Sequence, residues 1–261
     1  MTEALQKNNP ARFPASHIRN PGFFLRGKGE QMEDRKPLIP VKELAKRYAL
    51  FIISLFISAM GVAITKKGEL GVSPISSVAN VMSEKFTFLT LGNWLIIWNC
   101  VLILGQILIL RKKFQWIQLI QIPLSFLFGW FTDFGMWIFS FLKPSNYVFQ
   151  LLMVLVGTVV LSFGIALSVI ANVVMNSGEA FVKAISDTIH KEFGNVKVVF
   201  DISCVVAAVI LSLIFFDLRI VGTREGTVIS ALLTGFVVKF WNRLVRRPVE
   251  KILVGDREIN K

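Results

Sequence analysis

Two short polar clusters, rich in Ser, Gly, Pro and Asn, interrupt the apolar sequence of this chain. Ser or Asn before a helix and Pro at its first position favour a helix N-terminus, so each cluster predicts the start of a short helix. The first N–H groups of a helix are unpaired and carry partial positive charge, which suits an anionic or polar ligand. An ordinary capped helix explains each cluster equally well. The residues that we expect to bind a substrate are Gly71, Ser73, Pro74, Ser76, Asn176, Ser177, Gly178 and Glu179.

Ionisable residues inside apolar segments form the second group of candidates. Such residues are costly in a membrane and usually face a partner or a water-filled path. Lys197 and Asp201 are one helical turn apart, so they can pair on one helix face. Asn99 occupies the position that corresponds to Asp201 in the first half of the chain. We expect proton or cation coupling to involve Asp133, Asp201, Lys197 and Asn99; a purely structural anchor is the alternative for each.

The apolar part of the chain consists of two similar blocks, one from about residue 48 to 139 and one from about 147 to 241. Each block has a long apolar span, a short segment that begins at a polar cluster, and two more long spans. Three crossings per block would invert the second block relative to the first, as in many secondary transporters. The recurring phrases are Gly61-Val-Ala-Ile and Gly164-Ile-Ala-Leu, Gly92-Asn93 and Gly194-Asn195, and Gly129 and Gly235.

Runs of about 18 or more apolar residues predict membrane-spanning helices, because a helix satisfies its own backbone polar groups in hydrocarbon. The segments at about 71–86 and 177–192 are too short to cross, so we interpret them as re-entrant helices. The predicted fold is an all-α polytopic membrane protein with six transmembrane helices, two short re-entrant helices and two inverted pseudo-repeats. We place the spans at about 46–65, 92–110, 115–139, 147–171, 196–216 and 224–242.

Composition supports a membrane protein and excludes several other classes. The hydrophobic fraction is 54%, the mean hydropathy is +0.61 and only 18% of residues are charged, against about a quarter in soluble domains. The net charge of +12 comes from residues in the tails and beside spans, which favours contact with lipid headgroups over nucleic acid.

No catalytic signature is present in the sequence. It has no P-loop, nucleophile elbow, HExxH motif or GxGxxG turn. Cys100 and Cys204 fall inside predicted spans, and His17 and His190 are isolated. We therefore expect no enzyme activity, no metal site and no cofactor.

Basic residues beside the spans predict the orientation of the chain. Lys46 and Arg47 precede the first span, Arg111 follows the second and Arg243 follows the sixth, so both termini should be cytoplasmic in the plasma membrane. Translation from Met32 instead of Met1 is an alternative start. The expected organisation is a disordered cytoplasmic tail at 1–45, membrane repeats at 46–141 and 147–243, and a cytoplasmic C-terminal tail at 244–261.

The stretch from Gly61 to Phe240 resembles the YczE/YyaS-type family of bacterial integral membrane proteins, which is related to the YitT-type group. The residues that carry the resemblance are Gly61-Val-Ala-Ile, Leu70-Gly71-Val-Ser73-Pro74, Leu91-Gly92-Asn93-Trp94 and the segment from Gly129 to Asp133. The second half departs from the family pattern. It has Asn176-Ser177-Gly178-Glu179 in place of a Gly-Pro-Arg-Asp-like turn, and Lys197 and Asp201 in place of Arg and Glu. The resemblance implies a multi-pass membrane location and permease-like or regulatory roles.

These observations predict a small permease that moves a polar or anionic metabolite by alternating access between the two repeats. The expected partners are the lipid bilayer and a small-molecule substrate, with a homodimer as an option. A regulatory or scaffolding membrane protein that transports nothing is the alternative. A water-accessible pocket lined by the two short-helix N-termini favours transport, whereas apolar packing there favours a scaffold.

Overall fold

The computed structural model describes residues 40–111 and 114–254, and every regular element within these ranges is helical. Six helical stretches are long and apolar enough to cross a membrane, which confirms the six predicted spans. The helices in these stretches are α1 (Val41–Lys67), α3 (Leu91–Leu110), α4 (Gln121–Ile138), α5 (Tyr147–Ala171), α7 (Phe193–Phe215) and α8 (Glu225–Val254). Single 3₁₀ turns flank α4, namely η4 (Trp116–Ile120) and η5 (Phe139–Phe141).

One short helix follows the first span of each half, as the sequence predicts. They are α2 (Pro74–Lys85) and α6 (Ser177–Ile189). Because an α-helix rises about 1.5 Å per residue, each is about 20 Å long or less, too short to cross about 30 Å of hydrocarbon.

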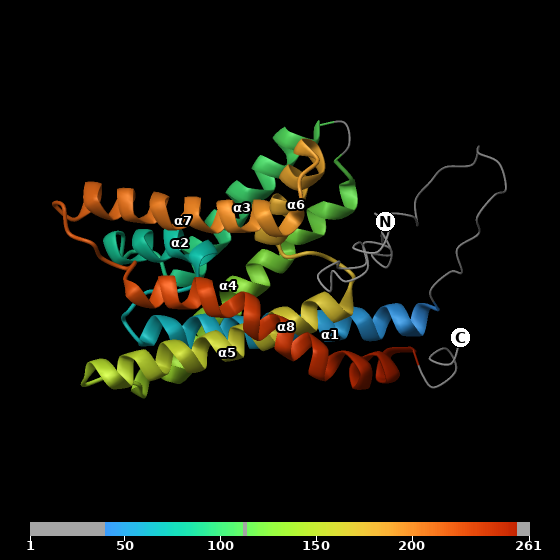
Figure 1. Ribbon diagram of the computed structural model, residues 1–261, viewed down its shortest axis with the longest axis horizontal. Helices are drawn as coiled ribbons and strands as arrows, with labels where there is room; N and C mark the ends of the chain where they lie inside the picture. The colour runs from blue at the N-terminus through green and yellow to red at the C-terminus, as the bar shows by residue number, and fades with distance from the viewer. Residues whose placement is uncertain (1–39, 112–113, 255–261) are drawn as a thin grey trace, which may run out of the picture. The chain divides into compact units, whose positions relative to one another are not determined.

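The helices α1 and α5 form the central pair of the bundle and run antiparallel (Figure 1). The guanidinium of Arg47, near the start of α1, donates to the carbonyl of Ala171 at the end of α5 over 3.2 Å. Two glycines allow the backbones to approach closely. A Cβ atom on Gly61 would lie 2.8 Å from the carbonyl oxygen of Gly157, and one on Gly164 would lie 2.8 Å from that of Ser54. Small residues at such contacts are typical of helix pairs in membranes.

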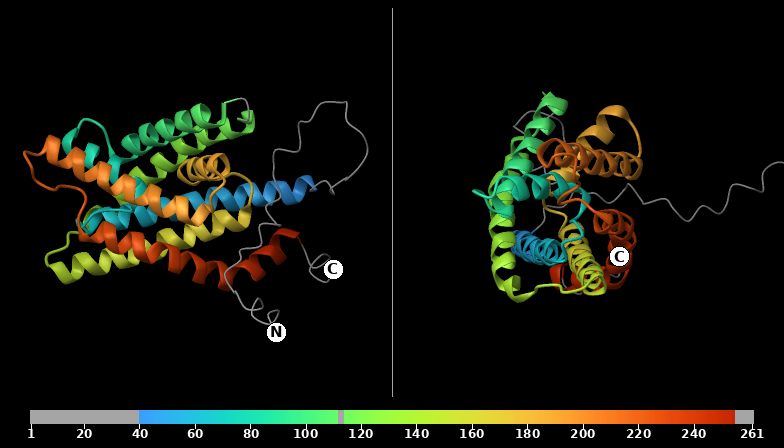
Figure 2. Two further views of the ribbon diagram at one scale, coloured as in Figure 1. Left: turned by 45° about the horizontal axis from the view of Figure 1, so that its top comes forward. Right: turned by 90° about the vertical axis from the view of Figure 1, so that its left-hand side faces the viewer.

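The remaining helices pack around this pair in corresponding contacts. Helix α4 packs on α1 and α8 packs on α5, while α2 packs on α7 and α3 packs on α6. The clearest departure from this correspondence is that α3 packs along α4 (Figure 2), whereas α7 and α8 make little contact within the described ranges. Helix α2 also contacts α8 without an equally strong contact between α6 and α4 in these ranges.

The core consists of apolar side chains between α1, α4 and α5, including Phe51, Leu55, Phe128 and Leu161. Large apolar side chains also cover the outside of the bundle: Val198, Ile202, Val206 and Ile210 are exposed along α7. An outward-facing apolar surface of this kind is what a bilayer requires. The chain is therefore a membrane protein with multiple spanning helices.

Both terminal helices extend further than the sequence predicts. Helix α1 begins at Val41, inside the expected tail, where Glu43 and Arg47 form an ion pair of 2.8 Å across one turn. Helix α8 continues beyond the expected end of its span at 242 to Val254, although Pro248 lies inside it. The ammonium of Lys46 donates to the carbonyl of Ile252 over 3.0 Å, so the two extensions support each other. Residues 1–39 of the tail expected at 1–45, and residues 255–261 of the tail expected at 244–261, lie outside the described residues.

Candidate functional site

The two polar clusters open the two short helices, but they cap them differently. Asn176 is the N-cap residue of α6, and its side-chain oxygen accepts from the backbone N–H of Ser177 over 3.0 Å. Ser73 is the N-cap residue of α2, yet its side chain makes no capping bond and instead donates to the hydroxyl of Ser76 over 3.0 Å. Pro74 takes the first helical position, as predicted. The Ser73 hydroxyl is thus not committed to the backbone of α2.

Contacts with α7 fix the depth of α2 in the bundle. The hydroxyl of Ser77 donates to the carbonyl of Pro74 over 2.6 Å and lies 3.3 Å from the carbonyl oxygen of Cys204, at the midpoint of α7. At the other end of α2, the ammonium of Lys85 donates to the carbonyl of Phe215, the last residue of α7, over 2.6 Å. Helix α2 therefore runs from the middle of α7 to its end, with its N-terminus deep in the bundle.

The N-terminal turns of α2 and α6 meet at this depth. A Cβ atom on Gly178 would lie 3.0 Å from the Cδ1 atom of Ile75, so the first turn of α6 lies against the first turn of α2. The sequence offset that separates Ile75 from Gly178 also separates Ser73 from Asn176 and Gly61 from Gly164. We call the region where these turns meet the seam, defined as residues 73–77 and 176–180. The Ile75 side chain fills the contact in this conformation.

Polar groups of α3 and α4 close one side of the seam. The buried amides of Gln106 and Gln121 bond to each other over 3.1 and 3.3 Å, and Gln106 also donates to the carbonyl of Ser177 over 3.1 Å. The Ser177 side chain is 1% exposed, and its hydroxyl has no partner within the described part of the chain. The sequence places both glutamines inside spans but gives no sign of their shared contact with Ser177.

The start of α8 packs against residues that flank the α2 part of the seam. Gly71, with a φ of +108°, lies so close to Thr227 that a Cβ atom would overlap the threonine hydroxyl. Asn80 of α2 donates to the carbonyl of Gly222 over 2.5 Å, and Thr223 is buried with its hydroxyl unpaired. The segment from Thr223 to Thr227 thus packs against the chain leading into α2.

The expected ion pair between Lys197 and Asp201 is present on α7. The ammonium lies 2.6 Å from one carboxylate oxygen, and both side chains are half-buried. Glu179, in the first turn of α6, is half-buried as well. Burial raises the pKa of the Glu179 carboxyl, with the charge of Lys197 opposing that shift and the charge of Asp201 adding to it. Glu179 of the seam thus interacts electrostatically with the Lys197–Asp201 pair, and we call these three groups the charged triad.

The other two coupling candidates, Asp133 and Asn99, are not part of the charged triad. The carboxylate of Asp133 accepts from the Thr90 hydroxyl over 2.6 Å and from the backbone N–H of Gly92 over 2.8 Å. Both bonds lie at the N-terminus of α3, so Asp133 ties α4 to that helix end. Asn99 is 5% exposed, inside α3.

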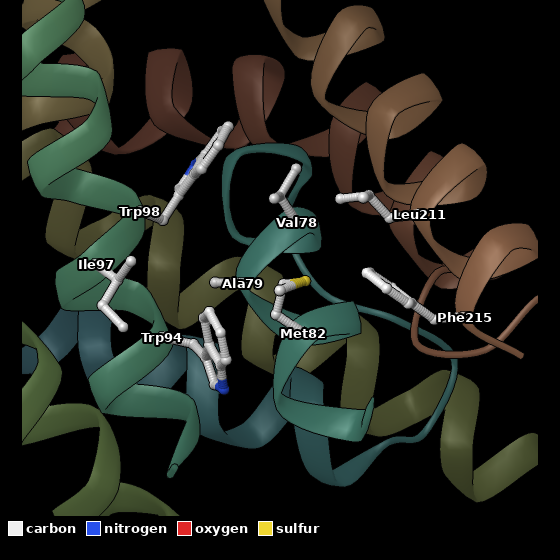
Figure 3. A pocket seen from close by; sticks show the side chains of 8 residues that line it. All are labelled: Val78, Ala79, Met82, Trp94, Ile97, Trp98, Leu211 and Phe215. Atoms are coloured by element: carbon white, nitrogen blue, oxygen red, sulfur yellow. The ribbon is translucent and has the colours of Figure 1, made fainter. Parts of the chain in front are cut away.

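Two cavities lie beside the short helices. The first, of about 210 Å³, lies between α2, α3 and α7, with Trp94 and Trp98 among its walls (Figure 3). The second, of about 430 Å³, lies between α6 and α7. Neither cavity has a residue of the seam in its lining. The seam itself is packed in this conformation.

Comparison with known proteins places the chain in a family. The model of a family of unknown function, DUF6198, matches residues 45–243. The chain is 26% identical over 203 residues to the "Uncharacterized membrane protein YczE" of Bacillus subtilis (strain 168), covering 76% of this chain and 86% of that protein. No solved structure matches. The chain therefore belongs to DUF6198, a family of unknown function, and its resemblance to YczE-type membrane proteins is confirmed.

Proposed function

We propose that the chain is a small permease whose two inverted repeats bind a polar or anionic metabolite at the seam between α2 and α6. The observation that carries this proposal is the meeting of two helix N-termini, at equivalent positions Ile75 and Gly178, deep inside the bundle. Discontinuous helices whose N-termini point at a substrate near the midplane are a recurring feature of secondary transporters.

Reciprocal contacts support inverted repeats. The contact of Gly61 with Leu161 corresponds to that of Gly164 with Ser58, because one sequence offset separates Gly61 from Gly164 and Ser58 from Leu161. A two-fold axis makes contacts reciprocal in this way. Since α1 and α5 run antiparallel, such an axis would lie in the plane of the membrane.

The depth of the two short helices supports re-entrance from opposite sides. The ion pair between Lys66 and Glu84 brings the C-terminal end of α2 back beside the end of α1, while its N-terminus lies at the midpoint of α7. Helix α6 packs on α3 in the corresponding way, where the ring of Phe181 lies against Gly105. Each short helix would then enter the membrane and leave on the side from which it came.

The chemistry of the seam suits a small anionic or polar substrate. Two sets of helix N–H groups point their partial positive charge into one region. The hydroxyls of Ser73, Ser76 and Ser177 add hydrogen-bonding groups that the backbone does not use. Gly71, Pro74, Asn176 and Gly178 shape the two turns, and Glu179 lies beside them.

In this proposal the structure is the occluded conformation. The Gln106–Gln121 pair closes the seam on the α6 side, and Thr227 against Gly71 closes it on the α8 side. Rocking of one repeat against the other would open one closure at a time and withdraw Ile75 from the seam. The charged triad of Glu179, Lys197 and Asp201 would couple that motion to a proton or cation. Asn99 and Asp133 are weaker candidates, because Asp133 already binds the first turn of α3.

The test is accessibility of the seam from both sides of the membrane. A single cysteine replaces Ser76 in a variant that lacks Cys100 and Cys204, and membrane-impermeant thiol reagents are added to either side of sealed vesicles. A permease exposes position 76 to each side in a fraction of molecules. Two control cysteines calibrate the labelling: one at Arg219, which is exposed in the loop before α8, and one at Phe126 on the exposed apolar face of α4. Protection of position 76 from both sides, with Arg219→Cys labelled, would contradict transport through the seam.

The non-transporting alternative has one observation in its favour. The seam is filled by Ile75 rather than by open space, which is how a regulatory or scaffolding protein would pack it. Such a protein would keep position 76 protected under all conditions, so the same labelling experiment separates the two functions.

A further inference from the structure

The cavity of about 430 Å³ is a groove between α6 and α7 that begins where these helices join. Its two ends differ in polarity. Lys191 and Asn195 lie at the junction, whereas the hydroxyl of Ser203 at the far end is already bonded to the carbonyl of Phe200 over 2.7 Å. From Asn195 to Ser203 the groove follows α7 for about 12 Å, at about 1.5 Å per residue. The wall between the ends is apolar and consists of Phe181, Ile185, Ile189, Val196, Val199 and Phe200.

The cavity in the first half of the chain lies at the corresponding position but is half as large, about 210 Å³. Trp94 and Trp98 stand there at the positions of Val196 and Phe200, counted from the shared Gly-Asn pair. Leu211 and Phe215 of α7 also line that cavity (Figure 3), while no residue of α3 or α8 lines the groove between α6 and α7. Smaller side chains and a missing third wall therefore leave the second groove open.

The surroundings of the groove determine what fills it. Val198, Ile202 and Val206 are exposed on the same helix, so this face of α7 lies against lipid. An open apolar groove in contact with hydrocarbon gains dispersion contacts when a chain of methylenes fills it. The cation at its mouth matches a phosphate, since a lysine ammonium binds phosphate as a point charge. Two acidic residues lie near this end of α6. Asp187 is paired with Lys183 over 3.2 Å, and Glu192 is the exposed N-cap residue of α7.

We propose that this groove binds one membrane phospholipid, with an acyl chain along α6 and α7 and the lipid phosphate on Lys191. The site is separate from the seam and does not depend on the proposed transport. Its occupant comes from the leaflet that faces the α6–α7 junction.

The test measures lipid retention by native mass spectrometry of the full chain. Two probes carry the same oleoyl chains: phosphatidylglycerol, which has the phosphate, and diacylglycerol, which lacks it. The wild-type chain should retain one phosphatidylglycerol molecule and bind diacylglycerol about tenfold more weakly. Val196→Trp introduces the residue type found at the equivalent position of the smaller cavity, Trp94, and should lower retention of both lipids at least tenfold. Val199→Phe fills the groove from an exposed position and should do the same if Val196→Trp does not fold.

Lys191→Gln should weaken the binding of phosphatidylglycerol about tenfold and leave the binding of diacylglycerol unchanged. Lys251→Gln removes an exposed lysine near the end of α8 and should change neither. Val206→Trp adds the same indole to the exposed face outside the groove and should also leave retention unchanged. Retention of phosphatidylglycerol at the wild-type level in both Val196→Trp and Val199→Phe would overturn the site. Equal loss in Lys191→Gln and Lys251→Gln would overturn the role of Lys191.

Discussion

At the scale of single residues, the structure separates polar groups that hold helices together from groups with no such task. Asp133 is the clearest member of the first kind, because both hydrogen bonds of its carboxylate serve the N-terminus of α3. The sequence indicates only that Asp133 lies in a span. Its partner Thr90 lies far away in the sequence, on another helix, so its role as a cap could not be derived from spacing.

Replacing Asp133 distinguishes a cap from a coupling group. Asp133→Asn keeps an oxygen that can accept from the Gly92 N–H, so its thermal stability in detergent should stay close to wild type. Asp133→Ala removes the acceptor and should lower the free energy of unfolding by about 1 kcal/mol, the usual cost of a lost cap. Equal destabilisation in both variants would show that the charge itself, rather than the hydrogen bond, is required.

Glu179 should make stability depend on pH. Burial raises its pKa, so the folded chain binds this proton more tightly than the unfolded chain does. The stabilising effect is complete below the ordinary glutamate pKa and is lost as pH rises through the raised value. In the wild-type chain the melting temperature should therefore fall as the pH rises above the ordinary glutamate pKa. In Glu179→Gln this fall should be smaller. Glu225→Gln, at the start of α8, is the control for the loss of a carboxylate elsewhere in the chain. Parallel profiles for Glu179→Gln and wild type would contradict the burial argument.

At the scale of elements, long apolar runs predict all six spans, and the Ser/Asn and Pro clusters predict where α2 and α6 begin. These features are local, so sequence reasoning finds them. The extension of α8 to Val254 was missed because charged residues after 242 indicate the end of a span, not the end of a helix. The contact between Gln106, Gln121 and Ser177 joins three helices and has no local signal.

The close pairing of α1 and α5 depends on glycine. Gly61→Ala places a methyl group against the backbone of Leu161 and Gly157, and should lower the free energy of unfolding by about 1–3 kcal/mol, the usual cost of overpacking. The matched control is Gly235→Ala on α8, where a Cβ atom meets nothing within 4 Å. Melting temperatures of the two variants in the same detergent check this prediction, and equal values would contradict the packing of α1 on α5.

The Gln106–Gln121 pair should behave as one energetic unit. Gln106→Leu leaves the amide of Gln121 unpaired and should destabilise the chain by roughly 1 kcal/mol, within the range measured for hydrogen bonds between membrane helices. Adding Gln121→Leu should cost little more, because both partners are then apolar. A double-mutant cycle on thermal stability provides the coupling energy, and additive effects would show that the two amides do not interact.

At the scale of the whole molecule, the proposal depends on two halves of opposite orientation that share a central seam. Helix contacts, glycine positions and short-helix starts recur between the halves, and α7 and α8 are the exception. The sequence predicts this duplication because short segments recur in the same order in both halves. The homodimer suggested by the sequence stays a prediction.

The most direct test of the inverted repeats is to determine on which side of the membrane two equivalent loops lie. Single cysteines at Thr87, between α2 and α3, and at Glu192, between α6 and α7, are labelled in sealed vesicles of known orientation with an impermeant thiol reagent; both positions are exposed. Inverted repeats with re-entrant short helices place the cysteine at 87 outside and the cysteine at 192 inside. Labelling of both from the same side would contradict the inverted arrangement and the seam that depends on it.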